Sequence, residues 1–308
     1  MILAHLDSPF LSEALESVAK QVTDLKFEIL VALDRPTKKL INQIDDFKLN
    51  FPSITITIFD LSSLGIAMRL NFLASKSRFG FLFILDSDDR MIPNRINAQA
   101  NYLLANPKCA VIGSSLAIID HMGNKIGEKG FFTNADYISL NKYKRLPVAH
   151  PAVAIRKESF CYVGGYRDFY WPSEDYDLWL RILDKFEISN TSEILTEYRV
   201  HPSQVTASKF FHKHASAIAA KVSSRKRNQG KMEINDVHEN PARWARRSPF
   251  FPYIILLSSR SAVWHRARKA LLGKNYLNVF FNLVIFMILS PISGRREIWN
   301  KLNKRIWH

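Results

Sequence analysis

Apolar runs rich in β-branched and aromatic residues alternate with amphipathic segments along the first 120 residues of this chain. The apolar runs have the length and composition of strands and lie at 1–4, 26–33, 53–59, 79–85 and 109–119. The segments between them show a helical spacing of apolar residues and lie at 8–18, 37–50, 65–77 and 93–107. Strands that alternate with helices of about 10–15 residues form a mostly parallel sheet with helices on both faces. The sequence therefore predicts an α/β fold for this part of the chain.

Positive charge is concentrated in the last third of the 308 residues. The chain carries 43 Lys and Arg against 28 Asp and Glu, and residues 209–308 hold 20 of the basic residues but only 4 of the acidic ones. The first 208 residues are close to neutral. Because the composition changes near residue 208, we expect an α/β domain over 1–208 and a basic helical region over 209–308.

The basic region contains two charge-free apolar blocks, 248–259 and 275–294. The second is near the length of about 20 residues that spans a bilayer. Basic residues lie on both sides of it, which favours a helix lying in the membrane interface over one crossing it. A buried helix of the folded body is the alternative. Nucleic acid is not expected as a partner, because the apolar residues form long blocks and are not interleaved with the basic side chains.

The N-terminus and the cysteine content point away from secretion. The first ten residues show no basic segment followed by a long apolar run, so a secretory signal is not expected. Cys109 and Cys161 are too few for a disulfide framework and fit a reducing compartment.

Carboxylates follow two of the predicted strands directly. Asp34 follows the strand 26–33, and Asp86, Asp88 and Asp89 follow the strand 79–85. Ligands of parallel sheets bind at the carboxyl ends of the strands. Three acids in four residues repel one another, and a divalent cation with oxygen ligands would neutralise them. The alternative is an ordinary acidic turn before the next helix.

A third acidic cluster, Glu174, Asp175 and Asp177, begins a predicted helix. Acids in a first helical turn are favoured by the helix dipole, which accounts for one or two of the three. The aromatic residues at 169–171 come immediately before the cluster. Aromatic faces beside a carboxylate suit a sugar, and ordinary packing is the alternative.

Together these segments resemble the family 2 glycosyltransferases of GT-A (Rossmann-like) fold, of the type that builds bacterial surface polysaccharides. The resemblance covers roughly residues 1–206. It departs from the family pattern at Leu33, where the first of two adjacent Asp is usual, and at 4–7, where Ala-His-Leu-Asp replaces Pro-x-Tyr-Asn. The segments that carry it are SPFLSEALESVAKQ, KFEILVALDRPT, LGIAMRLNFLA with FGFLFILDSDD, HPAVAIRKESFCYVGGYRDFYWPSEDYDLWLRI, and EYRVHPSQVT.

The resemblance implies a role for several of these residues. Asp34 would contact the nucleobase, uracil in many members, and Asp86 the ribose side of the nucleotide. Asp88 would bind the divalent cation, manganese or magnesium, that bridges the diphosphate. Asp175 would be the general base. The remaining assignments are a metal or diphosphate contact for His201, a diphosphate contact or a structural role for Arg199, and positions on the acceptor side for Trp171 and Glu174.

The function that follows is that of an inverting hexosyl- or N-acetylhexosaminyltransferase using a nucleotide-diphosphate sugar, for which UDP is expected. The acceptor would be a lipid-linked or growing surface glycan. This places the protein in the cytoplasm, peripheral on the inner face of the cell membrane.

Two alternatives remain open. A nucleotidyltransferase should show a Gly-rich basic loop after its first strand, and HLDSPF does not. A non-catalytic glycan-binding relative should lack Asp88 or Asp175, and both are present.

Overall fold

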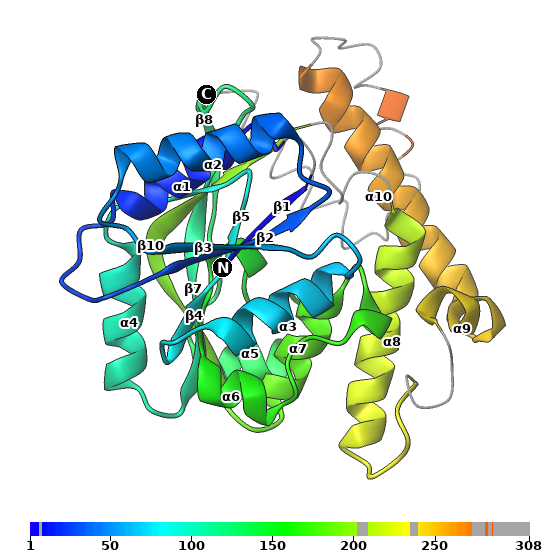
Figure 1. Ribbon diagram of the computed structural model, residues 1–308. Coiled ribbons are helices and arrows are strands. Elements are labelled where there is room, and N and C mark those ends of the chain that lie inside the picture. The colour runs from blue at the N-terminus through cyan, green and yellow to red at the C-terminus, as the bar shows by residue number, and fades with distance from the viewer. Residues whose placement is uncertain (6–7, 202–208, 235–239, 273–280, 283–284, 286–308) are drawn as a thin grey trace.

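The computed structural model describes residues 1–5, 8–201, 209–234, 240–272, 281–282 and 285, with the side chains of 267–272 excepted. The predicted apolar block 275–294 therefore lies almost entirely outside the described residues. The ribbon in Figure 1 shows a central α/β body with three further helices, α8, α9 and α10, along one side.

A parallel four-stranded sheet forms the first half of the body, as the alternating sequence predicts. Its strand order is β3-β2-β1-β5, and every pair in it is parallel. Its strands are β1 (Ile2–His5), β2 (Ile29–Asp34), β3 (Ile56–Asp60) and β5 (Leu85–Asp86). The predicted α/β fold is confirmed.

Helices cover both faces of this sheet because successive residues of a strand point to opposite faces. Ile29, Val31 and Leu33 of β2 pack in one core cluster with residues of α1 (Leu11–Ala19) and α2 (Lys38–Asn50). Leu30 and Ala32 pack on the other face against Leu73 of α3 (Ile66–Lys76).

A second sheet continues the body, and it is mixed. Its order is β4-β9-β7-β10-β6, with β8 also paired to β7. The long strands β7 and β10 are parallel, whereas the other pairs are antiparallel. Its strands are β4 (Phe81–Phe83), β6 (Arg90–Met91), β7 (Cys109–Ile119), β8 (Lys125–Lys129), β9 (Ala154–Arg156) and β10 (Glu187–Arg199).

The predicted strand 79–85 is divided between the two sheets. Its first part, β4, pairs antiparallel with β9, and its continuation, β5, pairs parallel with β1. Ile84 lies between them, and its carbonyl accepts a hydrogen bond of 2.8 Å from the buried Arg95 guanidinium. The same guanidinium donates to the carbonyls of Pro151 and Val153 at 2.8 and 3.0 Å. Arg95, on α4 (Arg95–Ala105), thus joins the point where the chain changes sheets to the turn η1 (His150–Ala152).

Some predicted bounds differ from the observed ones. The strand predicted at 193–201 is part of β10, which begins at Glu187 and ends at Arg199. The helices predicted from 8 and 93 begin at Leu11 and Arg95, because the residues before them form turns. Ser173 precedes α7 (Glu174–Leu183), but its hydroxyl donates to the carbonyl of Lys213 and does not cap the helix.

The helices after residue 208 pack on the body and on one another. Buried residues of α7 and α8 (Phe210–Arg227) share one core cluster that contains Tyr176, Leu180, Ala219 and Ala220. The boundary proposed at 208 therefore falls between segments that share a core. The other described helices are α5 (Ala135–Asn141), α6 (Lys157–Tyr162), η2 (Asp168–Tyr170), α9 (Pro241–Arg247) and α10 (Phe251–Leu272).

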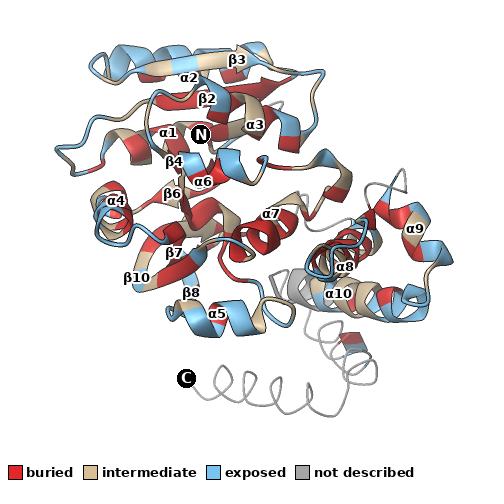
Figure 2. Cartoon of the chain, turned by 90° about the horizontal axis from the view of Figure 1, so that it is seen from below, coloured by how far each residue is buried: buried red, intermediate tan, exposed pale blue. Residues whose placement is uncertain are grey.

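The burial pattern separates α7 from α10. Figure 2 shows α7 almost wholly buried inside the body, while α10 keeps exposed residues along its length. Within the described part of the chain, every helix is too short or too polar to cross a membrane.

Candidate active site

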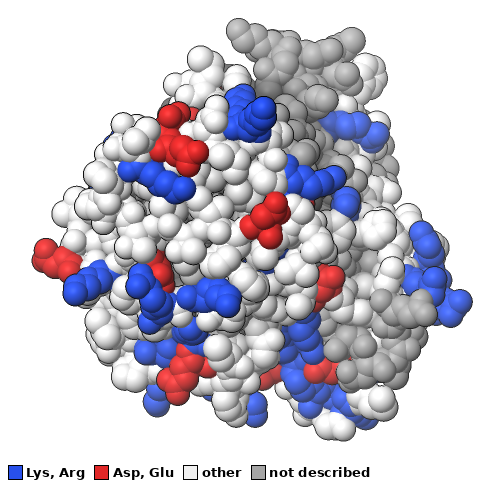
Figure 3. Space-filling model, viewed as in Figure 1, with Lys and Arg blue, Asp and Glu red and all other residues white. Residues whose placement is uncertain are grey.

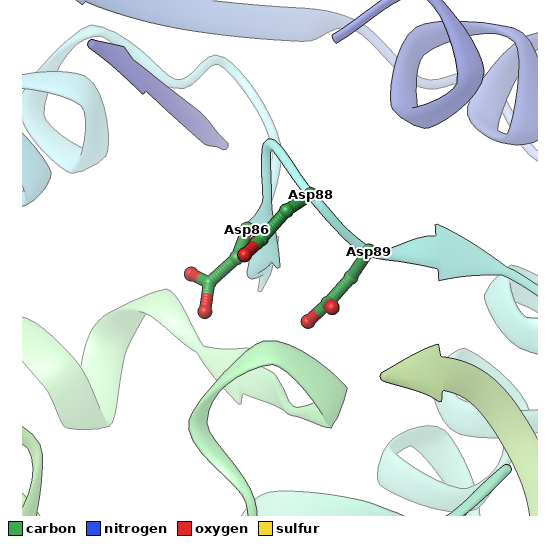
Figure 4. Close-up of side chains that lie close together, drawn as sticks. All are labelled: Asp86, Asp88 and Asp89. Carbon is green, nitrogen blue, oxygen red and sulfur yellow. The ribbon is translucent and has the colours of Figure 1, made fainter. Parts of the chain in front are cut away.

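Three carboxylate side chains extend from the turn between β5 and β6, at the carboxyl edge of the parallel sheet. One oxygen from each of Asp86, Asp88 and Asp89 lies within 4.8 Å of the others. Figure 4 shows the three side chains leaving this single turn toward the same side of the ribbon. The turn is short, so the negative charges are held close together by the backbone itself.

The electrostatics of the turn reflect this crowding. Burial, followed by the charges of Asp88 and Asp175, raises the pKa of Asp86 to about 7. Burial and the Asp88 charge also raise the pKa of Asp89 well above its usual range. Burial in turn lowers the pKa of Arg95, beneath the turn, to about 9. The cluster therefore binds protons unless a cation from outside the chain neutralises it.

The donor set of the turn fits a hard divalent cation. All three side chains offer carboxylate oxygens, which magnesium and manganese prefer. The Oδ2 atom of Asp89 is buried and has no hydrogen-bond partner among the described residues. The predicted metal ligands Asp88 and His201 are brought together, with His201 Nε2 2.9 Å from Asp88 Oδ2.

Arg199 is fully buried directly behind the acidic turn. Its Nε donates to the backbone carbonyl of Asp88 at 2.9 Å, and its Nη2 donates to Glu13 Oε2 at 2.6 Å. Its backbone N–H donates to Asp89 Oδ1 at 2.8 Å. These contacts favour the structural alternative for Arg199, in which it positions the turn. Direct contact with a diphosphate stays a prediction.

Asp34 ends β2 on the same sheet edge, directly beside His5 of β1. Its Oδ2 forms a buried ion pair of 2.8 Å with Arg69 of α3, and Arg35 Nε lies 3.5 Å from its Oδ1. Arg35 has a positive φ of 53°, which turns the chain sharply after the strand. The carboxylate is thus held in one orientation at the end of the sheet where nucleotide binding is predicted.

The first turn of α7 brings a second group of acids to the site. Asp175 accepts a hydrogen bond of 2.7 Å from the Tyr176 N–H. Burial, followed by the Asp175 charge, raises the pKa of Glu174 to about 8, and Glu174 Oε2 is buried without a hydrogen-bond partner among the described residues. The charge of Asp175 also acts on Asp86, so the first turn of α7 lies near the acidic turn.

Trp171 lies just before this helix, at the boundary with the later helices. Lys209 places its ammonium group 4.0 Å from the centre of the Trp171 ring, and Ser216 of α8 donates to the Trp171 carbonyl at 3.0 Å. The predicted acceptor side is therefore built jointly by the body and α8.

His150 is a site residue that the sequence analysis did not single out. Its Nδ1 lies 4.0 Å from Asp86 Oδ1, and its Nε2 lies 2.9 Å from the Tyr166 hydroxyl. Burial lowers the pKa of His150, and the Asp175 charge opposes this shift. The only signal in the sequence was its position within the segment that resembles the acceptor side of the family.

The geometry is that of the carboxyl edge of a parallel sheet with an acidic turn and further carboxylates nearby. The sequence model of the family described as "Glycosyl transferase family 2" matches residues 1–163, which is more than half of the chain. The chain belongs to glycosyltransferase family 2. Family membership confirms the resemblance, the enzyme class and the GT-A fold.

Two similar proteins of Escherichia coli are named glycosyltransferases. The O-antigen biosynthesis glycosyltransferase WbnJ is 30% identical over 47% of this chain and 58% of its own length. The UDP-Gal:alpha-D-GlcNAc-diphosphoundecaprenol beta-1,3-galactosyltransferase is 30% identical over 63% of this chain and 70% of its own length. The chain thus spans less than two thirds of the first and slightly more than two thirds of the second.

Solved structures share the fold at low identity. A structure of residues 1–349 of S. aureus TarS in complex with UDP superposes with a TM-score of 0.54 at 14% identity, over 91% of this chain and 87% of that fragment. The mannosyltransferase PcManGT from Pyrobaculum calidifontis, in complex with GDP-Man and Mn²⁺, gives a TM-score of 0.54 at 13% identity, over 94% and 83% of the two chains.

Proposed function

We propose that this glycosyltransferase moves a hexosyl or N-acetylhexosaminyl group from a UDP-sugar to a hydroxyl group of a lipid-linked or growing surface glycan, with inversion. The observation that carries the proposal is the pairing of two acidic groups across one site. The turn 86–89 offers carboxylate oxygens for a cation that would in turn bind the diphosphate, and the charge of Asp175 on α7 acts on Asp86 of this turn. The galactosyltransferase relative, named for a UDP-sugar and a diphosphoundecaprenol acceptor, supports the choice of substrates.

The residues divide the chemistry between them. Asp88, with His201 at 2.9 Å, would hold the divalent cation, and Asp34 would contact the nucleobase. Asp86 would contact the ribose side of the nucleotide, and Arg199 would keep the acidic turn in place. Magnesium or manganese bound there stabilises the negative charge on the departing diphosphate.

Asp175 would act as the general base on the opposite side of the sugar. It takes the proton of the acceptor hydroxyl as that oxygen bonds to the anomeric carbon, and the bond from that carbon to the UDP oxygen breaks. Attack opposite the leaving group inverts the anomeric centre. Glu174 and Trp171, beside the base, would line the acceptor side.

The test is a transfer assay with UDP-galactose and UDP-N-acetylglucosamine, magnesium or manganese, and a lipid-diphosphate-linked sugar as acceptor. The expected result is release of UDP and a product whose anomeric configuration, read by NMR, is opposite to that of the donor. Formation of a nucleotide sugar from a sugar phosphate and UTP would instead support a nucleotidyltransferase. Glycan binding without turnover of any donor would support a non-catalytic relative.

We further propose that the helices after 208 hold the enzyme on the anionic inner face of the cell membrane. Charge supports this, because Figure 3 shows Lys and Arg without acidic side chains over the visible part of α9. Apolar exposure supports it too, since large hydrophobic side chains on and just before α10 face solvent: Phe250, Phe251, Tyr253, Ile255, Leu256 and Trp264.

Vesicle binding tests this second proposal. Each basic residue near an anionic surface contributes about 1 kcal/mol, and buried apolar area adds a term that salt does not screen. Binding should rise with the fraction of anionic lipid and weaken without vanishing in high salt. The double variant Ile255→Ser, Leu256→Ser should bind less, while Leu140→Ser, at a more exposed apolar site on α5, should bind like wild type. Full-length protein that ignores anionic vesicles would contradict the proposal.

A further inference from the structure

His150 lies between the two acidic groups of the site and keeps part of its surface accessible. Its Nδ1 faces Asp86 Oδ1 at 4.0 Å, its side chain is 17% exposed, and the Asp175 charge acts on its ring. The other ring nitrogen, Nε2, is 2.9 Å from the hydroxyl of Tyr166. One ring nitrogen, Nε2, is therefore anchored to Tyr166, and the other, Nδ1, is directed toward Asp86.

The surroundings of this pair fix its position from both sides. Arg95 donates to the carbonyl of the residue after His150 at 2.8 Å. Asn71 accepts from the Tyr166 N–H and donates to the Tyr166 carbonyl, both at 2.8 Å. Gly165, with φ of +64°, lets Asn71 approach, because a Cβ there would lie 2.5 Å from Asn71 Oδ1. These contacts fix the backbone at both residues, and the hydrogen bond between His150 Nε2 and the Tyr166 hydroxyl joins the two rings.

The same contacts assign the proton on the imidazole. If Nε2 carried the proton, the lone pair of Nδ1 would face the carboxylate oxygen of Asp86, which is electrostatically unfavourable. If Tyr166 donates its hydroxyl hydrogen to Nε2, then Nδ1 carries the proton and directs an N–H toward Asp86. The Asp86 carboxylate therefore favours the tautomer in which His150 is a hydrogen-bond donor into the site, and Tyr166 supports it by donating to Nε2.

We propose that His150 is a sugar-binding residue, whose Nδ1–H donates to a hydroxyl group of the transferred sugar while that hydroxyl donates to Asp86. A hydroxyl oxygen can lie at ~2.8 Å from each of two atoms that are 4.0 Å apart. The inference rests on the proposed function, because the diphosphate at Asp88 and the base Asp175 place the sugar between them. His150 would thus help to select the donor by its sugar and not by its nucleotide.

The experiment compares the affinities for UDP and for UDP-galactose or UDP-N-acetylglucosamine by calorimetry with manganese present. His150→Phe removes the donor and should weaken UDP-sugar binding about fivefold to tenfold, the usual effect of one hydrogen bond, with UDP affinity unchanged. His150→Asn places an amide N–H near the position of Nδ1 and should recover part of the loss. His212→Asn, at an exposed histidine on α8, is the matched control.

Tyr166→Phe gives an independent arm, because it keeps the ring and removes only the hydroxyl that hydrogen-bonds His150 Nε2. It should weaken UDP-sugar binding by about twofold to threefold and leave UDP binding unchanged. Equal weakening of UDP and UDP-sugar, or no change in either, would overturn the inference while the proposed function stands. Wild-type protein that binds UDP but no UDP-sugar would overturn both.

Discussion

Asp175 and Asp177 are two residues apart on α7, and the charges that surround the two carboxylates are opposite in sign. Asp177 is 1% exposed and accepts hydrogen bonds from Arg167 and Arg181 at 2.9 and 3.0 Å. Asp175 faces the carboxyl groups of Asp86 and Glu174, and among the described residues no ion pair reaches it. At Asp177 the chain supplies its own cations, and the carboxylate is structural. Where it turns acids toward one another, a ligand is expected to complete the site.

The network of ion pairs around Asp177 extends beyond α7. Arg167 also pairs with Glu233 at 2.9 Å, Glu233 pairs with Arg227 of α8 at 2.9 Å, and Arg227 pairs with Asp184 at 2.6 Å. This network joins the body to the segment after 208. Behind the acidic turn, in contrast, the described cations are the buried Arg95 and Arg199, which donate mainly to backbone carbonyls, while His201 Nε2 lies 2.9 Å from Asp88 Oδ2.

The largest expected effect is on catalysis by Asp175→Asn. The variant keeps the size of the side chain and removes the base, so transfer should fall by about 10²–10⁴. UDP affinity and the free energy of unfolding should stay close to those of wild type. Steady-state transfer rates and urea unfolding measure the two quantities. Near-normal turnover of a folded variant would show that another residue is the general base. Asp175 would then not differ from Asp177 in catalytic role.

The matched change, Asp177→Asn, should have the reverse outcome. It leaves Arg167 and Arg181 without their buried partner, and breaking a buried pair from one side costs about 3–5 kcal/mol. Urea unfolding should show this loss, while the transfer rate of the remaining folded enzyme should change much less than for Asp175→Asn. Equal activity losses in the two variants would show that the network serves catalysis as well.

A smaller effect concerns Glu174 and pH. Its pKa of about 8 in the folded protein lies above its ordinary value of 4.5, so the folded state binds more protons than the unfolded state between these values. Stability contributed by the protonated form is therefore lost as the pH rises through this window. Glu174→Gln, which cannot ionise, should match wild type near pH 5 and be the more stable of the two near pH 8.5. Thermal unfolding at both pH values measures the difference, and parallel pH profiles would show that Glu174 is solvated.

Much of the fold could be predicted because its signals are local. The strand 109–119 is mostly apolar and has the predicted bounds, and the four helices between the first strands show clear periodicity. The division of 79–85 between two sheets could not be predicted. A buried apolar run shows that a strand is enclosed, whereas its partners β9 and β1 are set by distant parts of the chain.

The site residues also divide into those whose position the sequence predicts and those whose position it does not. The predicted residues at strand ends, Asp34, Asp86 and Asp88, lie at the expected edge of the sheet because strand ends follow directly from the pattern. The burial of Arg199 depends on a long-range contact with Glu13, and the position of His150 depends on one with Tyr166. Such contacts cannot be predicted from a single Arg or His in the sequence.

The central claim is that the clustered acids of the turn 86–89 hold a divalent cation, through which the diphosphate of the donor is bound. Calorimetry of UDP binding with manganese, with magnesium and with a chelator tests this directly, in wild type and in Asp88→Ala. We predict much tighter binding of UDP with either cation than with chelator, and loss of that enhancement in Asp88→Ala. Equal UDP affinity of the wild-type protein with chelator and with cation would contradict the account.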